Sequence, residues 1–134
     1  MGILDFFGKR DVSHETVYKL RCELHPMRLV AHKNEFVELD VVVENASDQE
    51  MLTSLVAVAP KTLGFDRTGL QHERELRLGM LRPGETRSVK LQVWSNQRTE
   101  AGDFPLKVFA ISHYRDYGHV LNEVRKDLTL RVTR

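Results

Sequence analysis

The amino-acid sequence predicts an all-β protein: a single sandwich of two antiparallel sheets with seven strands in total. Three observations predict this fold. Apolar residues recur at every second position from residue 16 onward, turn-forming residues separate these runs, and no segment has the period of a long helix. Because a parallel sheet is covered on both faces and reads as apolar throughout, the alternation favours antiparallel pairing. A chain of 134 residues suits one domain.

Seven segments have the character of strands. Four of them alternate cleanly, with apolar side chains on one face and polar ones on the other, and cover residues 16–25, 35–45, 86–95 and 122–132. Two more, 52–59 and 104–114, are partly apolar on both faces, which predicts central strands. A shorter strand is predicted over residues 73–79.

The segments between these runs are rich in turn residues. In Arg82-Pro83-Gly84-Glu85, Pro fixes φ ahead of a Gly that accepts positive φ, so this tetrapeptide predicts a tight turn. Further turns or loops are predicted at Asn45–Asp48, Pro60–Gly69, Ala101–Asp103 and Arg115–Gly118.

Three stretches occur in an order that is typical of one family. A Val-rich run ends in an Asn-containing turn, a Leu-x-Pro-Gly-Glu turn leads into another strand, and a Gly-x-Phe step opens an apolar strand. Here these are residues 41–47, 81–91 and 102–108. In this order the chain resembles an immunoglobulin-like module of the prokaryotic CARDB kind over residues 16–132. It is also similar to one half of an arrestin-like sandwich, which uses a Pro-Gly-Glu turn too. Both resemblances imply a fold and leave the function open.

The first 14 residues are predicted to form an apolar N-terminal tail ahead of a sandwich domain at 15–134. The apolar side chains of the tail share one face at helical spacing, which is consistent with a short amphipathic helix, and they are Ile3, Leu4, Phe6 and Phe7. Two interpretations stay open. The tail frays or folds onto the domain, or it docks on a partner groove or makes peripheral membrane contact through residues 3–10.

Composition and charge narrow the environment of the protein. The formal net charge is +1 and basic residues are mixed with acidic ones, so there is no dominant basic face for nucleic acid. The N-terminal stretch lacks the pattern of a secretory signal, and no window approaches the apolar length of a membrane span. A lone cysteine, Cys22, suits a reducing compartment. The sequence therefore predicts a cytoplasmic protein, with membrane association only through the tail.

The sequence contains no catalytic motif. It has no phosphate-binding glycine loop, no Gly-x-Ser-x-Gly and no His-Glu-x-x-His. Cys22 is expected on the core side of its strand, where burial raises the pKa of the thiol and leaves it inert. We therefore expect a protein that is not an enzyme, with no cofactor and no small-molecule substrate.

One histidine-bearing segment keeps a metal-binding or enzymatic alternative open. His113 and His119 flank Asp116, and two imidazoles and a carboxylate can bind a divalent ion if they converge. If Asp116 and Tyr117 form the tip of a hairpin, however, His119 lies opposite Tyr114 and His113 falls on the other face. These three residues are therefore weak candidates, and we expect no metal site.

Tyr114, Arg115 and Tyr117 in the same segment are interpreted as partner-binding residues, because Tyr and Arg supply much of the energy in binding surfaces. The alternative is that the tyrosines cap the end of the core. We expect a non-catalytic intracellular binding or scaffold module that recruits a protein partner through end loops, an edge strand or the N-terminal tail. Carbohydrate binding is a further alternative, with Trp94, Tyr114 and Tyr117 as the available aromatic platforms.

Overall fold

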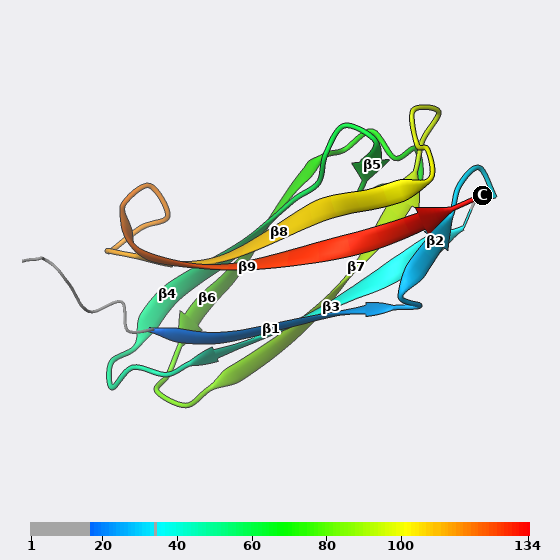
Figure 1. Cartoon of the computed structure of the whole chain (residues 1–134). Coiled ribbons are helices and arrows are strands. Elements are labelled where there is room, and N and C mark those ends of the chain that lie inside the picture. The colour runs from blue at the N-terminus through cyan, green and yellow to red at the C-terminus, as the bar shows by residue number, and fades with distance from the viewer. Residues whose placement is uncertain (1–16, 34) are drawn as a thin grey trace, which may run out of the picture.

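The computed structural model describes residues 17–33 and 35–134, which form nine strands in two stacked sheets (Figure 1). The four-stranded sheet has the order β1 (Tyr18–His25), β3 (Phe36–Asn45), β7 (Thr86–Ser95) and β5 (Leu63–Gly64). The five-stranded sheet has the order β2 (Arg28–Val30), β9 (Val120–Thr133), β8 (Gly102–His113), β4 (Met51–Val58) and β6 (Glu73–Leu81). Within the described residues, no helix is long and apolar enough to cross a membrane.

The core lies between the sheets, where every second side chain of the long strands points inward. Alternate residues of β3 are buried, and the central strands β4 and β8 supply the opposite layer. The most deeply buried apolar side chains include Val37, Leu39, Val41, Val43, Leu55, Leu106, Val108 and Leu130. Burying such side chains stabilises each by about 1.5–3 kcal/mol relative to exposure, so the alternating pattern drives the sheets together.

The structure confirms the all-β class and the sandwich, and it corrects the strand count. Each of the seven predicted strands is present, with ends within two residues of the predicted ones. The count of seven is wrong because β2 and β5 add three and two residues of pairing, too few to show a period. The prediction of wholly antiparallel pairing is also wrong, because β2 pairs with β9 in parallel. The predicted tail at 1–14, with Ile3, Leu4, Phe6 and Phe7, lies outside the described residues.

The two turns that carry the resemblance lie against each other. Asn45 is fully buried, and its side-chain amide donates to the carbonyls of Gln49 (2.8 Å) and Leu81 (2.9 Å). Its backbone carbonyl accepts from the Gly84 amide at 2.8 Å, and Gly84 adopts a φ of 79° that suits glycine. These bonds join the ends of β3 and β6 to the turn before β7, which explains why both turn motifs occur together.

A buried polar contact joins the two sheets. The Tyr18 hydroxyl of β1 lies 2.7 Å from the Thr53 hydroxyl of β4, and both side chains are almost fully buried. Burial raises the pKa of Tyr18 above its ordinary value. The contact fixes the position of β1 relative to β4 of the five-stranded sheet.

Candidate functional site

The loop between β8 and β9 forms a hairpin at one end of the sandwich (Figure 1). The Tyr114 amide donates to the His119 carbonyl at 2.8 Å, so these two residues lie opposite each other, as the predicted turn requires. Asp116 lies at the tip, and Arg115 adopts a φ of 70°. The predicted contact residues Tyr114, Arg115 and Tyr117 are therefore presented by one short hairpin, whereas those of the tail lie outside the described residues.

Tyr117 of the hairpin folds back onto the outer face of the five-stranded sheet. Its hydroxyl accepts from the Gly79 amide of β6 at 3.0 Å. Its ring meets the His113 ring edge-on, with centroids 5.0 Å apart, and the Arg77 guanidinium lies 4.7 Å from its centroid. Tyr117 is consequently half-buried and holds the hairpin in place, whereas Tyr114 is 52% exposed.

Beneath Tyr117 lies a buried hydroxyl–imidazole pair that sequence reasoning missed. The Ser54 hydroxyl of β4 is 2.8 Å from Nε2 of His113, and the two residues are 1% and 7% exposed. Nδ1 of His113 has no hydrogen-bond partner among the described residues. A nucleophilic serine needs an accessible hydroxyl and an oriented base, so this pair has the geometry of a packing contact.

The three weak metal candidates do not converge. Nδ1 of His119 is 2.8 Å from a carboxylate oxygen of Asp116, which also accepts from the Gly118 amide at 2.9 Å. The His119 hydrogen bond, followed by that of Gly118, lowers the pKa of Asp116 below its ordinary value. His113 is instead directed to Ser54. In the part of the chain that the structure describes, no three His, Cys, Asp or Glu side chains are grouped to hold a metal ion.

Four large apolar side chains are exposed around the hairpin, and we call them the hairpin patch: Met80, Tyr114, Val120 and Leu121. They are 50%, 52%, 60% and 54% exposed. Val120 pairs with His113, which pairs with Leu52, which pairs with Met80, so these residues form one row across the sheet. A register shift after Ser112 leaves Leu121 without a partner in β8. The Arg115 guanidinium lies 5.1 Å from the Tyr114 ring centroid and adds a cation to this surface.

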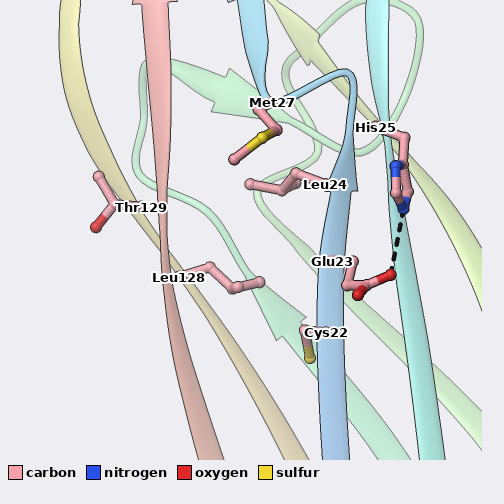
Figure 2. Close-up of a pocket in the computed structure, with 7 residues that line it drawn as sticks. All are labelled: Cys22, Glu23, Leu24, His25, Met27, Leu128 and Thr129. Carbon is pink, nitrogen blue, oxygen red and sulfur yellow. Dashed lines mark ion pairs between the residues drawn. The ribbon is translucent and has the colours of Figure 1, made fainter.

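A second surface feature is a groove between β1 of the four-stranded sheet and β9 of the five-stranded sheet. Figure 2 shows Leu24 and Met27 on one side of this groove and Leu128 on the other. Cys22 is on the inner face of β1, as expected, but it is only half-buried because β1 lies at an edge. Burial raises the pKa of its thiol to about 11, and the nearby Lys126 opposes this effect.

Two of the three proposed aromatic platforms are covered. Trp94 is only 9% exposed and packs against Phe36, with ring centroids 4.9 Å apart. Tyr117 is half-buried by its contacts with the sheet. Tyr114 alone among these three rings stands clear of the surface, which does not suit the broad platform of a carbohydrate site.

Known proteins resemble this chain in structure and not in sequence. No protein-family model matches the chain, and no curated protein matches it. A CARDB domain from Pyrococcus furiosus, in complex with di-metal ions, superposes with a TM-score of 0.55 at 13% identity over 87% of both chains. AvmM, which catalyses macrocyclization in alchivemycin A biosynthesis, gives 0.62 at 8% identity over 90% of both chains.

A third similar structure is a chain of the human seminal-plasma complex of zinc 2-glycoprotein and prolactin-inducible protein. It gives a TM-score of 0.56 at 10% identity and covers 90% of this chain and all of that one. Identities this low carry the fold and not the function. The chain therefore has the immunoglobulin-like sandwich fold of a CARDB domain, as the turn motifs of the sequence indicated.

Proposed function

We propose that this protein is a non-catalytic binding module inside the cell, and that it recruits a protein partner through the hairpin patch. The observation that carries the proposal is that the hairpin packs one aromatic side chain on the sheet and leaves its other large apolar side chains exposed. Tyr117 is held on the sheet by Gly79, His113 and Arg77, whereas Tyr114, Val120 and Leu121 are each more than half exposed. Grouped exposed apolar side chains mark interaction sites.

Rigidity makes this surface suitable for binding. Side chains presented by an ordered hairpin lose little conformational freedom when a partner covers them, so more of the contact energy appears as affinity. Tyr and Arg are also enriched among the residues that dominate binding energies. Tyr114 with Arg115 and the neighbouring Val120 provide an aromatic, a cationic and an aliphatic contact within one small area.

The buried Ser54–His113 pair favours a non-catalytic role over an enzymatic one. Tyr117 packs against His113, and Ser54 is 1% exposed, so a substrate would have to displace the hairpin to reach the hydroxyl. A divalent ion at this hairpin would need further ligands beside Asp116 and His119, and the described residues offer no group of three. Metal analysis of the purified protein, with Asp116→Ala as the comparison, would detect such a site.

The proposal is tested by affinity capture with quantitative mass spectrometry, using the full chain as bait. Tyr114→Ser and Leu121→Ser should each lose the proteins that the wild type captures specifically, because they remove exposed apolar contacts. Leu70→Ser is the matched control, since Leu70 is 65% exposed in the loop after β5, and Figure 1 shows β5 at the end of the sandwich away from the hairpin. Binding of one captured protein is then measured with both components purified.

Equal recovery by the wild type and both patch variants contradicts the proposal. Equal loss in Leu70→Ser contradicts it too, because the effect would then be unspecific. Phe6→Ser combined with Phe7→Ser separates the tail from the patch: a partner that depends on the tail alone is lost in this variant and kept in Leu121→Ser.

A further inference from the structure

Strand β1 has one unpaired edge. Among the described residues it pairs with β3 only, through eight consecutive antiparallel pairs without a register shift. The Ala46 amide donates to the Val17 carbonyl. In an antiparallel pair every second residue bonds to the neighbouring strand, so it is the odd-numbered residues of β1 whose backbone groups point toward β3. The backbone N–H and C=O groups of Leu20, Cys22 and Leu24 therefore point away from β3 and are available to another strand.

The other edges in the described chain carry features that discourage strand pairing. The edge strands β5 and β2 have two and three residues. The edge strand β6 has a register shift opposite Thr53 and Ser54. The free stretch of β9 places Lys126 opposite the buried Val108, so a charged side chain is on the inner side of that strand. By contrast, β1 has eight residues, no proline and no bulge.

The sequence of β1 is complementary to itself. Five residues read Leu20-Arg21-Cys22-Glu23-Leu24, and an antiparallel copy centred on Cys22 puts Leu20 opposite Leu24 and Arg21 opposite Glu23. Centring the pair on Arg21 or on Glu23 would put like charges opposite each other, which destabilises a sheet. Centring it between two residues would bring inner side chains to the outer face. Farther out, Lys19 would lie opposite His25, whose Nε2 is 3.4 Å from Glu23 and 3.5 Å from Asp40.

The neighbouring stretch of β9 has a similar order, with apolar residues at both ends, an arginine second and an acidic residue fourth. It reads Val124-Arg125-Lys126-Asp127-Leu128. The two stretches run side by side, because Leu20 and Val124 line one hollow while Leu24 and Leu128 line the next. Lys126 is close enough to Cys22 to affect the pKa of its thiol. A two-fold axis at Cys22 would bring Arg125 of one copy toward Asp127 of the other, but it would also bring the two Lys126 side chains toward each other, so the register rests on the charges of β1 and not on those of β9.

We propose that β1 is a self-association surface, on which a second copy of this chain pairs antiparallel about a two-fold axis at Cys22. The two four-stranded sheets then form one continuous sheet, and the half-buried Leu20 and Leu24 are covered by their counterparts. The surface is distinct from the hairpin patch. Because the paired strands run in opposite directions, the dimer presents its two hairpin patches at opposite ends.

The arrangement predicts a specific cross-link. Residues that exchange both backbone hydrogen bonds have Cα atoms about 5.5 Å apart, which lies within the range that a disulfide spans. Cys22 is the only cysteine in the chain, so a disulfide-linked dimer must join the two Cys22 residues. Copper–phenanthroline would accept the two electrons as the two thiols lose their protons and form the S–S bond.

Charge exchange at Arg21 and Glu23 tests the register. The full-length wild type should sediment as a dimer and should cross-link on oxidation. In Arg21→Glu, the new carboxylate of each copy lies opposite Glu23 of the other copy. These two repulsive pairs should weaken association by roughly tenfold or more. The double variant Arg21→Glu/Glu23→Arg restores opposite charges and should recover both the dimer and the cross-link. Arg98→Glu, at an exposed loop position, is the matched control and should not change association.

Two results would overturn the proposal. One is a wild type that remains monomeric at high concentration, which includes the case in which the N-terminal segment covers β1. The other is a dimer whose strength is the same in the wild type, Arg21→Glu and the double variant. Neither result affects the proposed role of the hairpin patch, which is measured with Tyr114 and Leu121 variants.

Discussion

Replacing Tyr117 tests whether the hairpin is held on the sheet. Tyr117→Phe removes the hydroxyl that accepts from the Gly79 amide at 3.0 Å and keeps the ring. A single hydrogen bond contributes about 0.5–1.5 kcal/mol, so the free energy of unfolding should fall by about 1 kcal/mol. Tyr117→Ala also removes the ring from His113 and Arg77, which adds about 0.5–1.5 kcal/mol for the aromatic contact and about 0.5–1 for the cation–π contact. The total loss should be about 2–3.5 kcal/mol.

Urea unfolding followed by intrinsic fluorescence measures both losses, with the m-value as a check that the transition stays two-state. Tyr114→Phe is the matched control, because the Tyr114 ring is 52% exposed and its hydroxyl makes no hydrogen bond among the described residues. Its free energy of unfolding should equal that of the wild type. If Tyr117→Ala also unfolds at the wild-type urea concentration, the hairpin is not held by these contacts, and the binding surface is not rigid in the way that the proposed function requires.

Three further predictions concern the turns and the groove. Asn45→Ala should lower the free energy of unfolding by at least about 2 kcal/mol in urea titrations, because it leaves the carbonyl of the buried Leu81 without its side-chain donor; wild-type stability would contradict this. Because burial raises the pKa of the Cys22 thiol to about 11, the rate at which it reacts with a thiol reagent should rise with pH up to about that value. At neutral pH the rate should be roughly a hundredfold below that of an ordinary thiol. A rate that levels off near the ordinary pKa of about 8.5 would contradict this prediction. Because the pKa of Asp116 is lower in the fold, its contribution to stability is complete above the ordinary aspartate pKa and is lost as the pH falls through the lowered value. Asp116→Asn should therefore show a smaller drop in melting temperature on acidification than the wild type, and identical pH profiles would contradict this.

The long strands could be predicted from the sequence because burial on one face imposes a period of two. The same reasoning could not find β2 and β5, since their few residues pair with strands far away in the chain. It also placed Cys22 on the correct face but overestimated its burial, because the order of strands decides which of them is an edge.

The hairpin shows the same division between local and distant information. The pairing of Tyr114 with His119 follows from the local turn, and it could be predicted. The contact between Tyr117 and Gly79, and the pairing of Ser54 with His113, depend on β4 lying between β6 and β8. No local pattern in the sequence carries that order, so the capping role of Tyr117 stayed one of two open interpretations.

Photo-cross-linking from the hairpin patch in living cells tests directly whether this patch binds a protein partner. A photoreactive phenylalanine analogue is introduced at Tyr114, which is 52% exposed, and, in a separate sample, at Leu70, which is 65% exposed in the loop after β5. If the hairpin patch binds a partner, position 114 should give one discrete protein adduct that is lost when Leu121→Ser is added, and position 70 should give no such adduct. The same adducts from both positions, or an adduct from position 114 that persists in Leu121→Ser, would contradict this prediction.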